Sequence, residues 1–203
     1  RLLLLSLALL LLLVGCINRR SGTSWADLSL IEVNESPAIM VAYEGYIVTV
    51  DPATGESLPL INPVTGSERF DDDGNPRIWE ITRDGSEFVT TPIFLDDETL
   101  LIAEQKRLTQ LDVANARVNE IAQIDLDGHV LADILVTEDR IYVPFSEQNL
   151  AAYDLESLEQ LWVFPTERGV WASPILIEGV LYVVSLDHYL YAVDADSGES
   201  LWT

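Results

Sequence analysis

A repeat of about 40 residues constrains this 203-residue chain more than any other feature. Moving the last unit back by one period places Leu161-Trp162 under Leu201-Trp202. An aspartate marks the same point of each unit, at Asp51, Asp112, Asp154 and Asp194. The first of these spacings is about 20 residues longer than the later ones, which predicts an insertion at 59–77. The fold is therefore expected to repeat one small unit.

Each unit has the pattern of short β-strands. In the last unit, apolar runs at 173–177, 180–185, 189–194 and 199–202 are separated by turn residues such as Glu178-Gly179. Helical periodicity is absent outside the first residues of the chain. Four antiparallel strands per unit predict an all-β fold, a β-propeller with blades at about 29–80, 88–121, 130–164 and 170–203. A β-sandwich is the alternative, but it predicts no fixed period.

Four blades are expected to be about half of a seven- or eight-bladed ring, and a closed four-bladed ring is the less favoured alternative. The chain begins with Arg1 instead of methionine. We therefore expect it to be a fragment that lacks its true start and its later blades.

The last unit carries the pattern Ala192-x-Asp194-x-x-x-Gly198-x-x-x-Trp202. The aspartate can accept hydrogen bonds from the N–H groups of its own turn, and the glycine permits a positive φ. The tryptophan can lie flat against the next blade, where the small alanine leaves room beside it. We predict that these residues join one blade to the next.

The other units keep this pattern in part. Blade 3 has Ala152, Asp154 and Trp162 but Leu158 in place of the glycine. Blade 1 has Asp51 and Gly55 but Thr49 and Pro59, so Trp79 is an alternative docking aromatic there. Blade 2 keeps only Asp112, with Gln110, Ala116 and Glu120 at the other positions.

The pattern resembles the tryptophan-docking motif of quinoprotein-type repeats, over about 29–203. The segment Leu13-Val14-Gly15-Cys16 resembles the bacterial lipobox. A lipobox followed by these repeats is similar to lipoproteins of the BamB-type family, which assembles outer-membrane proteins. The resemblance implies a propeller without enzymatic activity that binds envelope proteins, including a barrel-insertion machine and unfolded outer-membrane proteins. No partner-binding residue is transferred from the family.

The first residues have the features of a lipoprotein signal peptide. Leu2–Val14 is apolar and has the length of a signal-peptide core, too short for a comfortable bilayer span. It ends in Leu13-Val14-Gly15-Cys16, which resembles the bacterial lipobox. We predict a signal peptide at 1–15, lipidation of Cys16 and a tether at 16–28, with an ordinary transmembrane anchor as the alternative. Ile17 favours the periplasmic face of the outer membrane, or the outer face of the cytoplasmic membrane in a single-membrane source.

Charge and cysteine content exclude several classes of protein. There are 11 Lys and Arg residues against 34 Asp and Glu residues, a formal net charge of −23, which argues against nucleic-acid binding. A single cysteine permits neither an intramolecular disulfide nor a cysteine-based zinc site.

The residues that could catalyse a reaction or bind a cofactor or metal do not form a recognisable site in the sequence. Quinoprotein dehydrogenases typically use a vicinal cysteine pair, a calcium ion and a catalytic aspartate. The acidic segment 71–75 could suggest calcium, but Arg69 occupies the first ligand position. His129 and His188 are expected in solvated turns, and no serine has a nucleophile context. We expect no catalytic, cofactor-binding or metal-binding residue, and a chain that is not an enzyme.

The sequence therefore predicts a lipid-anchored envelope propeller that acts as a protein-interaction scaffold, with a role in outer-membrane barrel assembly. The alternative is part of an extracytoplasmic quinone-dependent dehydrogenase or a solute-binding propeller.

Overall fold

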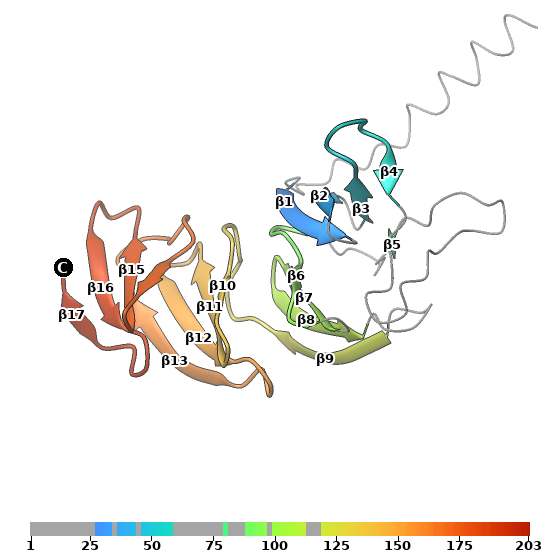
Figure 1. Cartoon of the computed structure of the whole chain (residues 1–203). Coiled ribbons are helices and arrows are strands. Elements are labelled where there is room, and N and C mark those ends of the chain that lie inside the picture. Colours follow the sequence, from blue (N-terminus) through green and yellow to red (C-terminus); the bar gives the residue numbers. More distant parts are fainter. Residues whose placement is uncertain are drawn as a thin grey trace, which may run out of the picture.

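A computed structural model describes residues 27–33, 36–43, 46–58, 79–80, 88–96, 99–112 and 119–203. In this part of the chain all regular elements are β-strands, and they form four antiparallel sheets that fan out along an arc (Figure 1). The prediction of an all-β propeller of antiparallel blades is confirmed. The signal peptide, Cys16, the tether up to residue 26, the 59–77 insertion and the acidic segment 71–75 lie outside the described residues.

Each sheet is one blade, and its strands follow one another in chain order. Blade 1 contains β1 (Asp27–Val33), β2 (Ser36–Tyr43), β3 (Tyr46–Val50) and β4 (Ser57–Leu58), while β5 (Trp79–Glu80) also pairs with β3. Blade 2 contains β6 (Ile93–Phe94), β7 (Thr99–Glu104), β8 (Arg107–Asp112) and β9 (Asn119–Asp125). Blade 3 contains β10 (Leu135–Val136), β11 (Arg140–Phe145), β12 (Asn149–Asp154) and β13 (Gln160–Pro165). Blade 4 contains β14 (Ile175–Ile177), β15 (Val180–Val184), β16 (Leu190–Asp194) and β17 (Ser200–Trp202).

The second and third strands of the inner blades are buried on both faces. Every residue of β11 after Arg140 is buried, and so are the four central residues of β12. Residues at alternate positions of a strand point to opposite faces, so such a strand must pack against a neighbour on each side. This explains why the middle strands of the repeat are apolar at nearly every position.

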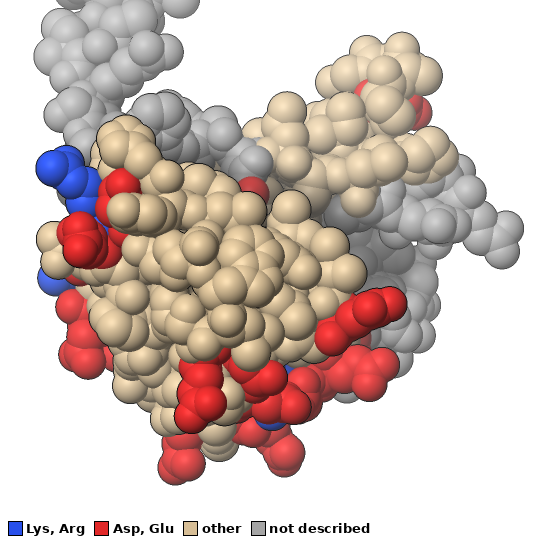
Figure 2. Space-filling model, turned by 90° about the vertical axis from the view of Figure 1, so that its left-hand side faces the viewer, with Lys and Arg blue, Asp and Glu red and all other residues tan. Residues whose placement is uncertain are grey.

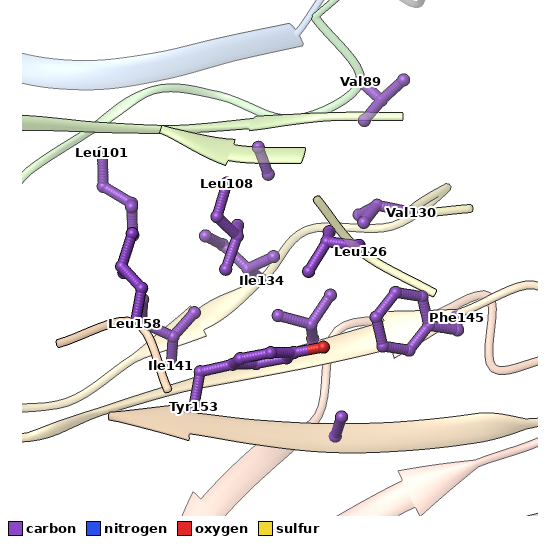
Figure 3. Close-up of a cluster of buried hydrophobic side chains, with 13 residues drawn as sticks. Val89, Leu101, Leu108, Leu126, Val130, Ile134, Ile141, Phe145, Tyr153 and Leu158 are labelled. Atoms are coloured by element: carbon purple, nitrogen blue, oxygen red, sulfur yellow. The ribbon is translucent and has the colours of Figure 1, made fainter. Parts of the chain in front are cut away.

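The cores of the protein lie between blades. Among the described residues, blades 2 and 3 enclose the largest cluster, in which Leu101 and Leu108 of blade 2 face Ile141, Tyr153 and other residues of blade 3 (Figure 3). Separate clusters lie between blades 1 and 2 and between blades 3 and 4. Because each blade buries its side chains against its neighbours, stability in this fold depends on the blade junctions.

Among the described residues, no helix has the length and apolar character needed to cross a membrane.

Candidate functional site

The turn after the third strand has the same construction in blades 1, 3 and 4. Asp194 Oδ1 accepts hydrogen bonds from the backbone N–H groups of Asp196 (3.1 Å) and Ser197 (2.8 Å) and from the Ser197 hydroxyl (2.8 Å). Asp154 repeats this arrangement with Glu156 and Ser157. These bonds, above all the one from the serine N–H, hold the pKa of both carboxyls below the usual value.

Asp51 also accepts hydrogen bonds from the next turn residues, Ala53 N–H at 2.6 Å and Thr54 N–H at 3.2 Å. The same turn contains a residue with positive φ, which is Gly55 (71°) in blade 1 and Gly198 (73°) in blade 4. Blade 3 has Leu158 at this point, with φ of 57°. A leucine in this conformation carries backbone strain, so its surroundings must stabilise it.

Between blades 3 and 4, the indole of Trp162 lies directly against Gly198. A Cβ atom at Gly198 would come within 2.6 Å of the Trp162 ring, so only glycine fits beneath the indole. Trp162 Nε1 donates to the Ala195 carbonyl at 3.2 Å, and the same oxygen accepts bonds from Arg140 Nη1 (2.8 Å) and the Tyr142 hydroxyl (3.3 Å). Ala152 lies opposite Trp162 in the sheet and is fully buried.

Between blades 2 and 3, different residues make an equivalent junction. The residue opposite Gln110 in the sheet is Ala122, so the assignment of Glu120 to the tryptophan position is wrong. The sheet partner of Gln110 is 12 positions further along the chain, whereas the partner of Ala152 is 10 positions further, so alignment by a fixed spacing is wrong by two positions here. Gln110 Nε2 donates to the Leu155 carbonyl at 2.6 Å, and Leu158 is almost fully buried (1% exposed) in the cluster against which Ala122 packs. This junction therefore has an alanine at the position of Trp162 and a leucine at the position of Gly198.

The docking residues of blade 4 form the same local arrangement on the last sheet. Trp202 lies opposite the fully buried Ala192, and its ring centroid is 6.0 Å from that of Tyr182. Tyr142 and Trp162 have a matching separation of 5.9 Å in blade 3. Trp202 differs from Trp162 in being half exposed (49%). The docking role of the motif residues remains a proposal that these contacts support. Trp79 pairs with Ile47 through the backbone.

A pocket of about 590 Å³ opens where loops of blades 3 and 4 meet. Its lining comes from the β11–β12 turn (Ser146 to Gln148), the β13–β14 connection (Glu167 to Gly169, and Trp171) and Leu186 of the β15–β16 turn. Trp171 is 57% exposed there. A Cβ atom at Gly169 would lie 2.4 Å from the Ser146 carbonyl oxygen, so a glycine is required where these loops touch.

The pocket has charged groups of both signs. His129 Nδ1 contacts Glu147, which also accepts hydrogen bonds from the His129 N–H (2.6 Å) and the Ser146 hydroxyl (2.9 Å). Burial works to raise the pKa of Glu147, but the bonds from His129 and Ser146 outweigh it and hold the pKa below its usual value. The Arg168 guanidinium makes no ion pair with any described side chain.

The sequence did not reveal this pocket. His129 was expected to be a solvated turn residue; its side chain is 43% exposed, and it is also paired with Glu147. Nothing in the sequence links these residues, which are 18 positions apart. No group of three or more His, Cys, Asp or Glu side chains that could hold a metal ion occurs in the part of the chain that the structure describes.

Comparison with known proteins gives three kinds of similarity. A family model described as outer membrane protein assembly factor BamB matches residues 43–173 and 119–203. The structure of BamB from Moraxella catarrhalis is similar over 88% of this chain and 64% of that one, with 14% identity and a TM-score of 0.59. Sqt1 from Saccharomyces cerevisiae is similar over 88% of this chain and 48% of its own, with 11% identity and a TM-score of 0.60. The chain thus spans less than two thirds of either structure.

The third similarity corrects one expectation. A 1-butanol dehydrogenase (cytochrome c) from Thauera butanivorans is 42% identical over 52 residues, which are 26% of this chain and 6% of that protein. The expectation that the chain is not an enzyme is contradicted by this match, because the matched segment is part of an enzyme.

Proposed function

Since the chain belongs to the family of the outer membrane protein assembly factor BamB, we propose that it is a cell-envelope propeller that binds other proteins during assembly of outer-membrane β-barrels. The observation that carries this proposal is the family match, which extends over residues 43–203. The propeller fold supports it, because a rigid ring of blades presents its loops as a fixed binding surface.

We assign protein binding to the pocket between blades 3 and 4. Trp171 and Leu186 offer apolar surface to one side chain of a partner, and an exposed tryptophan is a frequent hot spot of protein interfaces. Arg168 and the polar side chains of Ser146 and Gln148 can pair with the carbonyl and N–H groups of an extended segment. The partner is thus an extended polypeptide with an apolar side chain, as an unfolded barrel protein would present.

The proposal includes attachment to the membrane through a lipid on Cys16, with the propeller on the periplasmic face of the outer membrane. Acyl chains stabilise membrane attachment by about 0.8 kcal/mol for each buried CH₂ group. Replacing the thiol removes the site of acylation, so Cys16→Ser should move the protein from the membrane fraction to the soluble fraction. A variant that still pellets with membranes would disprove the anchor.

Affinity purification from envelope extracts tests the binding function. The wild-type protein should recover a component of the barrel-assembly machinery or an outer-membrane client. Trp171→Ala should lower that recovery several-fold, because Trp171 and Leu186 are the two large apolar side chains that line the pocket. Leu161→Ala is the matched control, since Leu161 is also exposed but lies on β13 outside the pocket. Recovery of neither class of protein by the wild type would reject the assembly function.

The similarity to a dehydrogenase favours a second candidate, namely part of a quinone-dependent enzyme. Pyrroloquinoline quinone is a planar tricarboxylate, so its binding site needs an aromatic plate and several cations. The pocket has Trp171 and Arg168, but Glu147 and Glu167 also line it and would repel carboxylates. These residues therefore do not fit that cofactor. Quenching of tryptophan fluorescence by added pyrroloquinoline quinone and calcium, with dye-linked alcohol oxidation, would support this second candidate against the first.

A further inference from the structure

The pocket between blades 3 and 4 contains a residue with a strained backbone. Gln148, in the β11–β12 turn, has φ of 87°, which lies in the left-handed region that favours glycine. Glycine would adopt this conformation without strain, whereas a glutamine there lowers the stability of the fold. Strained residues of this kind cluster where a side chain serves a function. Gln148 is therefore a candidate for a functional residue of the pocket.

The same turn in the next blade shows that the strain comes from the shape of the turn. His188 lies 40 positions after Gln148, in the β15–β16 turn, and has φ of 74°. His188 is exposed and is not among the residues that line the pocket. The two turns thus share one backbone conformation, but of these two residues it is Gln148 that contributes to the pocket.

The side chain of Gln148 is available to a bound molecule. Its amide group makes no hydrogen bond to any residue that the structure describes. Its backbone is held in place, because the Gln148 carbonyl accepts a hydrogen bond from the Thr166 N–H at 2.9 Å. The neighbouring polar groups are already paired, since the Ser146 hydroxyl donates to Glu147 and Glu147 accepts the His129 N–H. The Gln148 amide thus offers an acceptor oxygen and a donor NH₂ group on a fixed turn.

A peptide group is a natural partner for this carboxamide. The Gln148 oxygen can accept a main-chain N–H while its NH₂ group donates to a main-chain carbonyl. In an extended chain the side chains alternate between two faces, so one segment can also place an apolar side chain against Trp171 and Leu186. Charged side chains on the blade 4 side of the molecule are mostly acidic (Figure 2), so an uncharged or basic segment is favoured over an acidic one.

We propose that Gln148 determines the specificity of the pocket, because it pairs with one N–H and one carbonyl of the main chain of an extended polypeptide. This inference rests on the function proposed above and defines the partner more closely. Main-chain hydrogen bonds do not depend on the sequence of the bound segment, whereas pockets for side chains do. The pocket should therefore accept many extended segments, provided that each carries an apolar residue for Trp171 and Leu186.

Fluorescence polarisation of a short labelled peptide, in which threonine and leucine alternate, tests this proposal on the whole chain in a mild non-ionic detergent. Gln148→Ala removes the amide and should weaken binding several-fold. Analogues of the peptide that are N-methylated at one residue each lack one N–H. At one position, N-methylation should weaken binding to the wild type several-fold and leave binding to Gln148→Ala unchanged, because the partner of that N–H is then already absent.

Gln148→Gly separates the role of the side chain from the strain of the turn. Glycine adopts a positive φ freely, so the melting temperature should rise by about 2 °C while binding weakens as in Gln148→Ala. His188→Gly is the matched control. It relieves the same kind of strain and should also raise the melting temperature, but it should leave peptide binding unchanged because His188 does not line the pocket.

Several results would overturn the proposal. These are a wild type that binds none of the peptides, a Gln148→Ala variant that binds as tightly as the wild type, an effect of N-methylation that is the same in both proteins, or a melting temperature that falls in Gln148→Gly. The affinity purification described above decides the assembly function separately, since it measures recovery of envelope proteins by the wild type and does not use the peptide.

Discussion

We compare the junctions on the two sides of blade 3 and predict that the stability lost through one substitution can be partly restored by a second one. Trp162→Ala removes the indole that packs on Gly198 and its bond to the Ala195 carbonyl. The ring is partly exposed, so we expect a loss of about 3 kcal/mol, at the low end for a tryptophan-to-alanine change. Gly198→Leu alone should cost about 3–5 kcal/mol. Of this, roughly 1–2 kcal/mol comes from the positive φ and the rest from the clash with the Trp162 ring.

The double variant reproduces the combination found between blades 2 and 3, where Ala122 occupies the tryptophan position, Leu158 occupies the glycine position, and both belong to one packed cluster. The leucine should fill the space left by the indole, so its clash disappears and only the backbone strain and the lost hydrogen bond remain. We expect a total loss of about 3 kcal/mol, against about 6–8 kcal/mol if the two effects were independent.

Urea unfolding followed by circular dichroism measures these four proteins in one double-mutant cycle. Leu161→Ala is the control, because an exposed leucine outside the junction should change the free energy of unfolding by less than about 0.5 kcal/mol. Additive effects of Trp162→Ala and Gly198→Leu would refute the compensation argument.

Three further predictions concern single turns. The turn lowers the pKa of Asp194, so this carboxylate stabilises the fold at pH values above its unfolded-state pKa. The contribution is lost as the pH falls through the folded-state pKa. Asp194→Asn should therefore make the free energy of unfolding depend less on pH in the acid range. Burial and the hydrogen bond to Asp187 raise the pKa of Tyr191 to about 12, and burial raises the pKa of Tyr153 to about 12 as well. Ultraviolet titration should therefore show both tyrosines ionising late, and Tyr191→Phe should remove the share of one tyrosine from that late step. Because the raised pKa favours the protonated form, its stabilisation is complete below the unfolded-state pKa and is lost as the pH rises through the folded-state pKa. Gly169→Ala should displace the pocket loop from Ser146, because the added Cβ atom would strike the Ser146 carbonyl oxygen. In affinity purification this variant should recover several-fold less partner protein, while its melting temperature should change by only a few degrees.

The sequence was sufficient to predict the repeating part of the fold. Strands predicted at 180–185 and 189–194 are found at Val180–Val184 and Leu190–Asp194, because these segments combine β-branched residues with turn residues at a fixed spacing. The aspartate turns were equally readable, since an Asx turn depends on residues only two or three positions apart.

Contacts between blades were harder to predict. The sequence predicted that blade 2 is a weak copy of the motif, but Gln110 donates to a carbonyl of blade 3, and Ala122 packs against the cluster that buries Leu158. These residues belong to different repeats, so an alignment of the repeats shows each of them only as a departure from the motif and does not show that they pack together. The pocket and the pair of His129 with Glu147 were missed for the same reason, because they form where loops of separate segments meet.

The buried Leu158 means that the blades of this chain are not interchangeable. If blade 3 followed itself, the indole of Trp162 would meet a leucine instead of a glycine, and if blade 4 followed blade 2, Ala122 would leave a void above Gly198. Similar repeats risk pairing in the wrong order as they fold. Differences in side-chain size at each boundary penalise such errors, so the order of the blades is encoded in the contacts that hold them together.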